Sequence, residues 1–155
     1  MAKIYPILTV PDPILRKKSV ELDFAEFSKR ELDELCRNMT ATMLESDGVG
    51  LAAPQIGKNI RIVIINTADG PVCMINPKIT KKSILKEWGE EGCLSLPDIF
   101  GQVRRHKKIS CLYQDRTGKK ISIKAEGLFA RVIQHEIDHL DGVLFIDKMR
   151  PLKKN

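Results

Sequence analysis

Two histidines and a glutamate near the end of the chain, His135, Glu136 and His139, have the types and the spacing of a catalytic metal site. Residues four apart in an α-helix lie on one face with their Cβ atoms about 5–6 Å apart, so both imidazoles can bind one ion. The carboxylate of Glu136 lies beside them and can accept a proton from a water molecule that the ion polarises. The pattern therefore indicates metal-assisted hydrolysis.

The same pattern occurs in zinc peptidases, but the residues that follow His139 argue against that class. Such peptidases take a third ligand from a Glu, His or Asp downstream of the helix. Sixteen residues follow His139, without Glu or His, and Asp141 and Asp147 are their only carboxylates. A buried helical turn with two hydrogen-bonded histidines is the alternative, although two of the chain's three histidines fall in this motif. We therefore expect the third ligand upstream.

Cys93 is the best upstream candidate for the third ligand. Gly92 precedes it and Pro97 follows it, which indicates an irregular backbone that presents a side chain instead of burying it in a regular strand. A thiolate is a soft ligand that accepts Fe(II) or Zn(II). A free, unligated cysteine is the alternative. The other cysteines lie in periodic segments and are interpreted as small core residues: Cys36, Cys73 and Cys111.

The elements that must position these side chains are a helix near each end and a strand-rich middle. A capping box and apolar residues at helical spacing predict a helix over 29–45, followed by a glycine-rich loop over 48–57. Turn signals separate five β-rich segments, over 60–66, 72–76, 79–88, 108–113 and 120–126. The last helix begins near Gly127 and ends at Asp141-Gly142, and its expected buried side carries Leu128, Val132, Ile133, Ile137 and Leu140.

This order of elements predicts an α+β fold. A central metal-binding helix should pack against mostly antiparallel β-sheets, with the N-terminal helix beside them. The length predicts one domain spanning residues 1–155, and hydrophobic and charged residues, at 43% and 30%, are at ordinary levels for a globular protein.

Composition also limits the setting and the partners of the protein. Its apolar runs are of strand length and its first residues form no signal-peptide core, so we expect a cytoplasmic protein without a membrane span. The widely spaced cysteines agree with a reducing compartment. The net charge is +6, but no aromatic residue interleaves with the basic clusters, which argues against sequence-specific nucleic-acid binding. A weak attraction to a polyanion such as the ribosome remains open.

Three segments together resemble the signature motifs of the peptide deformylase family, in the family's order. They are Gly-Val-Gly-Leu-Ala-Ala-Pro-Gln-Ile-Gly at 48–57, Glu-Gly-Cys-Leu-Ser-Leu-Pro at 91–97 and Gln-His-Glu-Ile-Asp-His at 134–139. The resemblance extends over nearly the whole chain, from Pro11 to Phe145. It implies a metal-dependent hydrolase that removes the N-formyl group from N-formylmethionine of newly synthesised polypeptides and releases formate.

The resemblance also implies roles for individual residues. Glu136 would be the general base, which later protonates the leaving amine. The side-chain amide of Gln55 and the backbone N–H of Leu94 would stabilise the tetrahedral oxyanion. We expect the metal to be Fe(II), with Zn(II), Ni(II) and Co(II) as alternatives in purified protein. The ligands of this one divalent ion would be Cys93, His135 and His139.

A further set of residues is expected to bind the substrate or to shape its site: Gly48, Val49, Gly50, Glu91, Arg105 and Val132. The glycines allow a main chain to approach closely, so a peptide can pair along this loop as an added strand, although a tight turn is the alternative explanation. The valine of the last helix is a candidate wall for the methionine pocket. Asp138 either accepts a histidine N–H or is a solvated helix charge.

The expected partners are N-formylmethionyl peptides and nascent chains. Many members of the family continue into a basic C-terminal helix used at the ribosome, whereas this sequence stops at Asn155, so we do not expect docking by that route. One rival function is a zinc peptidase indifferent to Cys93→Ser. The other is a degenerate module that binds formyl-Met peptides without turnover, and the intact Glu136 and Gln55 argue against it.

Overall fold

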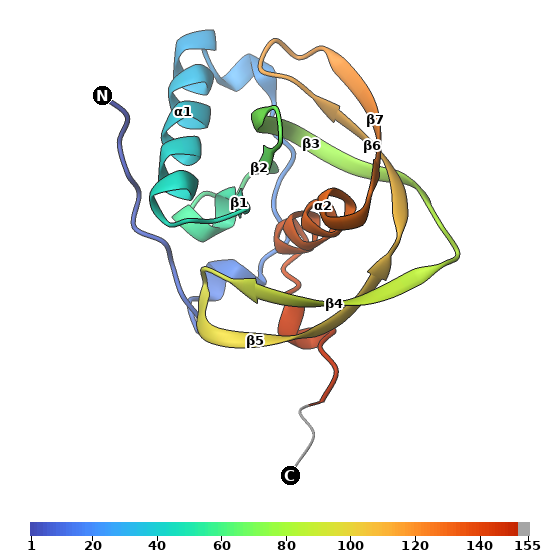
Figure 1. The fold of residues 1–155 in the computed structure, drawn as a ribbon. Helices are drawn as coiled ribbons and strands as arrows, with labels where there is room; N and C mark the ends of the chain where they lie inside the picture. The colour runs from blue at the N-terminus through green and yellow to red at the C-terminus, as the bar shows by residue number, and fades with distance from the viewer. Residues whose placement is uncertain (152–155) are drawn as a thin grey trace.

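The structure, a computed structural model, describes residues 1–151, within which two α-helices lie among seven β-strands (Figure 1). The helices are α1 (Lys29–Glu45) and α2 (Gly127–Leu140), with short 3-10 helices η1 (Pro13–Arg16), η2 (Phe24–Glu26), η3 (Ala53–Ile56) and η4 (Phe145–Asp147). The strands are β1 (Gly50–Ala52), β2 (Ile62–Thr67), β3 (Gly70–Lys82), β4 (Lys86–Cys93), β5 (Leu96–His106), β6 (Lys108–Gln114) and β7 (Lys120–Glu126). The predicted α+β class is confirmed.

Helix α1 has the bounds that the sequence predicts, because its capping box forms. The Glu31 N–H donates to Ser28 Oγ at 3.1 Å, and the Ser28 N–H donates to Glu31 Oε2 at 2.8 Å. These two bonds satisfy backbone donors that a helix start otherwise leaves without partners. The apolar face of α1 is buried, with Met39 and Met43 at zero exposure.

Five strands form one antiparallel sheet in the order β1-β2-β3-β6-β7, so β1 lies at an edge. Successive residues of a strand point to opposite faces, and β2 is covered on both. Ile62 and Ile64 pack in the cluster that contains the α1 residues, whereas Val63 and Ile65 pack in the cluster that contains the α2 residues. The apolar run of β2 is therefore continuous because the strand lies between two helices and is buried on both faces.

Strand β3 is longer than the sequence predicts. It passes through Asn76 and Pro77, where the sequence predicts a turn between the segments 72–76 and 79–88. It also includes the first part of the segment 79–88, whose last part belongs to β4. The register against β6 shifts between Ile75 and Lys78, and Asn76 has a φ of 51°. Such a bulge accommodates a proline and a left-handed residue without ending the strand.

Strands β4 and β5 form a separate two-stranded antiparallel sheet that lies beside α2 (Figure 1). The sequence did not predict β5. Most of its residues from Pro97 to Gln102 are exposed, so the strand lacks the apolar alternation that marks a half-buried strand. The hairpin matters here because its two strands carry residues of the candidate site.

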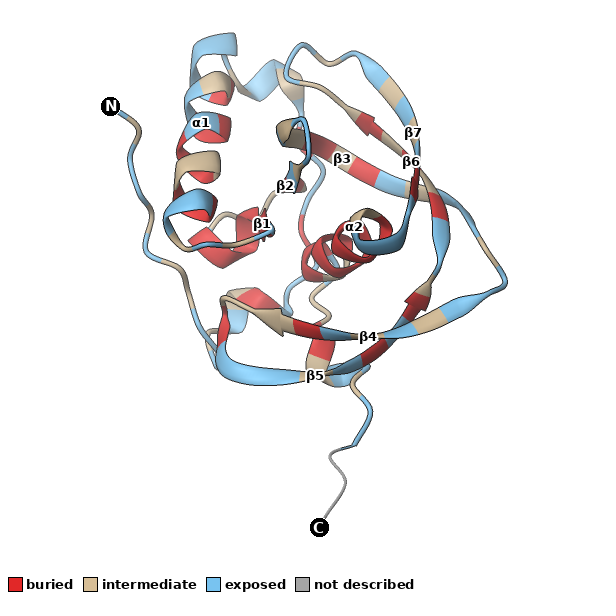
Figure 2. Cartoon of the chain, viewed as in Figure 1, coloured by how far each residue is buried: buried red, intermediate tan, exposed pale blue. Residues whose placement is uncertain are grey.

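Helix α2 lies in the middle of the molecule, surrounded by both sheets, and Figure 2 shows it almost wholly buried. Val132, Ile133, Ile137 and Leu140 are buried as predicted, but the same prediction for Leu128 is wrong, because 69% of that residue is exposed. It lies in the first turn, beyond the edge of the core. Among residues 1–151 no helix has the length and apolar character to cross a membrane.

Candidate metal centre

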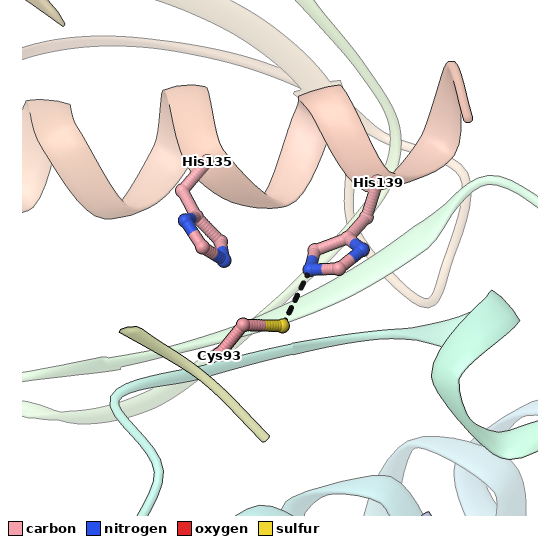
Figure 3. A group of neighbouring side chains, drawn as sticks. All are labelled: Cys93, His135 and His139. Carbon is pink, nitrogen blue, oxygen red and sulfur yellow. Dashed lines mark hydrogen bonds between the residues drawn. The ribbon is translucent and has the colours of Figure 1, made fainter. Parts of the chain in front are cut away.

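Three side chains from two elements meet beside α2: His135 and His139 from the helix, and Cys93 from the end of β4 (Figure 3). Their potential ligand atoms all lie within 4.8 Å of one another, and Cys93 Sγ is 3.2 Å from His139 Nε2. The helical spacing predicted that the two histidines share a face. The structure brings the predicted third ligand to that face as well.

The backbone that presents Cys93 is partly as the sequence predicts. Cys93 is the last residue of β4, so the expectation that it lies outside regular strand structure is wrong. The expected irregularity exists one peptide away, because the pairing with β5 shifts register between Gly92 and Cys93, which pairs with Leu96. The thiol points toward α2 (Figure 3). The core interpretation is confirmed for the buried Cys36 and Cys111, whereas Cys73 is half-buried.

Glu91 holds His135 in place. Its Oε1 accepts hydrogen bonds from His135 Nδ1 at 2.8 Å and from Arg105 Nη2 at 2.8 Å. Its Oε2 accepts from Arg105 Nε at 2.9 Å and from Arg131 Nη1 at 2.7 Å. Burial opposes ionisation of Glu91, but the hydrogen bonds from Arg105 and His135 outweigh it and bring the pKa well below its usual range. Because Nδ1 of His135 is engaged, its Nε2 is left for a ligand.

Asp138 does not accept a histidine N–H. Its carboxylate forms ion pairs with Arg105 Nη1 at 2.5 Å and with Lys148 Nζ at 3.0 Å. Asp138 is therefore neither the acceptor of a histidine N–H nor a solvated charge, because both of its ion-pair partners are side chains of the protein. Glu91, and not Asp138, is the carboxylate that orients a ligand histidine.

Burial sets the pKa of two of the three helix residues in the site, Glu136 and His139. It raises the pKa of Glu136 to about 7 and, with the charges of His135 and Arg105, lowers the pKa of His139 to about 3. For His135, burial lowers the pKa, but the proximity of the Cys93 thiol and the hydrogen bond to Glu91 outweigh it and raise the pKa to about 10. The neutral His139 is the form that binds a metal, and the groups around His135 favour positive charge there.

Gln55 directs its amide nitrogen toward the cluster. Its Oε1 accepts from the Ala52 N–H at 2.9 Å, and its Nε2 lies 3.1 Å from Ser95 Oγ and 3.6 Å from Cys93 Sγ. The first bond fixes which end of the amide faces the site. A donor that is buried and oriented in this way suits an oxyanion.

A cavity of about 450 Å³ opens beside the cluster. Ten of the twelve predicted site residues line it, all except Arg105 and His139: Gly48, Val49, Gly50, Gln55, Glu91, Cys93, Leu94, Val132, His135 and Glu136. The prediction missed the other lining residues, which include Phe100, Leu128 and Arg131. Phe100 lies on the unpredicted β5, and an arginine in a buried helix was the available signal for Arg131.

Gly50 has a use that the sequence does not predict. A Cβ at this position would lie 2.7 Å from Glu136 Oε1 and 2.9 Å from its Cγ. Glycine at this position therefore permits the Glu136 side chain to lie close to β1. The neighbouring Val49 is 55% exposed and precedes β1, which lies at the edge of the sheet.

Comparison with known proteins gives a consistent result. The polypeptide deformylase family model matches residues 4–155. The peptide deformylases of Desulfotalea psychrophila and Thermotoga maritima are 42% and 43% identical to this chain, over 98% and 97% of it and 91% and 90% of their own length. The T. maritima crystal structure matches with a TM-score of 0.90 at 43% identity, over 96% of this chain and 99% of that one.

A structure with a bound inhibitor matches equally well. The actinonin-bound class I type b peptide deformylase from Acinetobacter baumannii has a TM-score of 0.91 at 36% identity, with 96% of this chain and 100% of that chain covered. The fold and the site together define a metal-dependent hydrolase. The chain belongs to the polypeptide deformylase family, enzymes that remove the N-formyl group from newly synthesised polypeptides. This separates it from the zinc peptidases.

Proposed function

We propose that Cys93, His135 and His139 hold one divalent metal ion, and that Fe(II) is the ion in the cell. The observation that carries the proposal is the mutual reach of the three ligand atoms, within 4.8 Å. Two further observations support the fit. The groups around His135 favour positive charge, and Glu136 Oε2 is buried without a hydrogen-bond partner in the described residues. A thiolate with two imidazoles suits Fe(II), Zn(II), Ni(II) and Co(II).

The chain's own residues then divide the work of hydrolysis. A cation bound there supplies Lewis acidity, which polarises the formyl carbonyl and acidifies water. Glu136 accepts a proton from the water that attacks the formyl carbon, and it returns that proton to the leaving amine as the C–N bond breaks. Its raised pKa, about 7, suits a group that must both accept and donate near neutral pH. Gln55 Nε2 and the Leu94 N–H donate to the developing oxyanion.

The substrate would enter along the edge of the larger sheet. The peptide backbone pairs with Gly48, Val49 and Gly50, and the methionine side chain occupies the cavity against Val132. Structures of the A. baumannii relative with bound Met-Ala-Ser, at 34% identity, and with actinonin support a peptide ligand. Glu91 and Arg105 act behind the site by fixing His135.

We further propose that residues 1–155 form one catalytic domain. This domain acts on nascent chains in the cytoplasm. The net charge of +6 supports a weak association with the ribosome. Basic residues also occur at 148–154, and those after residue 151 lie outside the described part of the chain.

The test is formate release from a formyl-Met peptide by protein purified without oxygen, together with its metal content. Activity with Fe(II), Ni(II) or Co(II), and its loss by 10²-fold or more in Glu136→Ala, is expected, since about 10²–10⁴-fold is typical of a general base. The Glu136→Ala protein should retain its metal, because the ligand atoms are unchanged. Absence of formate release with all three metals, or cleavage of internal peptide bonds that survives Cys93→Ser, contradicts the proposal.

A further inference from the structure

Arg131 connects α2 to the β4–β5 hairpin from inside the molecule. It lies one helical turn before His135, and only 8% of it is exposed. Its Nη1 donates to Glu91 Oε2 at 2.7 Å and to the Val103 carbonyl at 2.9 Å, and its Nη2 donates to the Glu87 carbonyl at 2.9 Å. One guanidinium therefore binds both strands of the hairpin and a carboxylate on one of them.

The hairpin is shaped to receive this guanidinium. A Cβ at Gly89 would lie 2.7 Å from Arg131 Cζ and 2.8 Å from its Nε and Nη2. The guanidinium thus packs directly on the β4 backbone, in space that any larger residue at position 89 would fill. This close packing is an independent sign that the position of Arg131 is built into the fold.

Arg131 and His135 use different oxygens of the same carboxylate. Both oxygens of Glu91 accept two hydrogen bonds each, which uses about all four acceptor positions of a carboxylate. Arg105 contacts both oxygens, but it comes from β5 and is shared with Asp138. Arg131 is the cation that comes from the same helix as the histidines.

The connection also reaches the thiol. Glu91 precedes Cys93 by two residues on β4, so a guanidinium that fixes Glu91 against α2 also fixes the distance between the strand that carries Cys93 and the helix that carries His135. A displacement of about 1 Å is enough to impair a catalytic site.

We propose that Arg131 is a positioning residue of the metal centre. It locks Glu91 and the end of β4 to α2, and so keeps Cys93 Sγ and His135 Nε2 within reach of one cation. This inference rests on the proposed Cys93-His135-His139 site, and it extends that site to a residue that contacts no ligand atom.

The test measures Co(II) binding by the metal-free protein, because the absorption bands of cobalt and of its thiolate charge transfer report ligand number and geometry. We expect Arg131→Met to raise the Kd for Co(II) by about 10–100-fold, as is usual when a group behind a metal ligand is removed. The cobalt spectrum should change, and Arg131→Lys should restore binding only in part, since one ammonium cannot make the forked contacts.

Arg61 offers a matched control. Its Nη1 donates to the Leu140 carbonyl at 3.0 Å and its Nη2 pairs with Asp141 at 2.9 Å, so it holds the other end of α2 in the same manner without touching Glu91. Arg61→Met should lower the unfolding midpoint, as Arg131→Met does, and should leave the Co(II) affinity and spectrum unchanged. Equal effects of both variants on Co(II) would show a merely structural role and overturn the proposal.

Gly89→Ala tests the same contact without removing any charge. The added methyl displaces the guanidinium, so the cobalt spectrum should resemble that of Arg131→Met, and this variant keeps the proposal testable if Arg131→Met does not fold. In a Glu91→Gln background, adding Arg131→Met should weaken Co(II) binding by less than about threefold, because both changes break one connection.

The outcomes separate the two proposals. If the wild-type protein binds Co(II) through its thiolate and both Arg131→Met and Gly89→Ala keep that Kd and spectrum, the role of Arg131 is wrong and the metal site stands. The role of Arg131 is also wrong if Arg131→Met weakens Co(II) binding as much in the Glu91→Gln background as in the wild-type protein. If the wild-type protein shows no thiolate–cobalt band, the metal site is wrong, and this inference falls with it.

Discussion

Glu136 is confined by the backbone of the neighbouring strand. The side chain lies so close to β1 that only the missing Cβ of Gly50 leaves room for it. The same confinement removes water from the carboxylate, which raises its pKa to about 7. The position and the pKa of the Glu136 carboxylate therefore both depend on the space that Gly50 leaves.

Gly50→Ala should lower kcat for formate release by about 10²-fold, because its methyl group pushes Glu136 aside and a displacement of about 1 Å can have that effect. The bound metal should not change, since the methyl group contacts neither Cys93 nor the histidines. Steady-state kinetics with metal analysis checks this. Val49→Ala is the control, because it changes an exposed side chain of the same predicted substrate-binding segment. Loss of the bound metal in Gly50→Ala would contradict this explanation.

At the scale of elements, the short helix η4 packs against the candidate metal centre. Phe145 stacks on His135, with ring centroids 6.0 Å apart, and it is almost fully buried. The helix is held by Asp147, whose Oδ2 accepts from the Leu144 N–H at 3.0 Å and from Arg16 Nη1 at 2.6 Å. The hydrogen bond from Arg16 lowers the pKa of Asp147, and the Leu144 N–H adds to the effect.

This contact makes stability depend on pH. Because the folded state has the lower pKa, the contribution of Asp147 is complete above the unfolded pKa, about 3.9, and disappears as the pH falls through the folded value. Both partners are exposed, so Asp147→Asn should lower the free energy of unfolding at pH 7 by no more than about 1 kcal/mol. Urea unfolding at pH 7 and near pH 2 checks this, with Glu21→Gln as an exposed control. A difference that persists at the lower pH would contradict it.

The elements also show what local sequence can and cannot predict. Helix α1 was predicted to its exact bounds because its cap and its periodicity are properties of neighbouring residues. Strand β5 was missed because an exposed hairpin strand is stabilised by its pairing with β4, which no local pattern records. In the site, the ligands and the base have characteristic spacing. The four hydrogen bonds on Glu91 come from three residues on two distant elements, β5 and α2, so they emerge only in the folded chain.

At the scale of the whole molecule, the candidate metal centre lies between the two sheets. The histidines belong to α2, which packs against the five-stranded sheet, and Cys93 belongs to the separate β4–β5 sheet. A cation held by all three would therefore connect the two sheets through the central helix. An ion that binds the folded chain more tightly than the unfolded one stabilises the fold by mass action.

Metal removal should therefore lower the stability of the whole chain. With Ni(II) at about 100 times its Kd, the free energy of unfolding should exceed that of the metal-free protein by about 2.7 kcal/mol. Urea unfolding with and without the metal measures the difference. Cys93→Ala should abolish most of it, because the remaining ligands both lie on α2 and no longer bridge the sheets. Cys73→Ala, which removes a half-buried thiol outside the centre, should retain it in full. An equal metal-dependent gain in Cys93→Ala would show that the ion binds elsewhere.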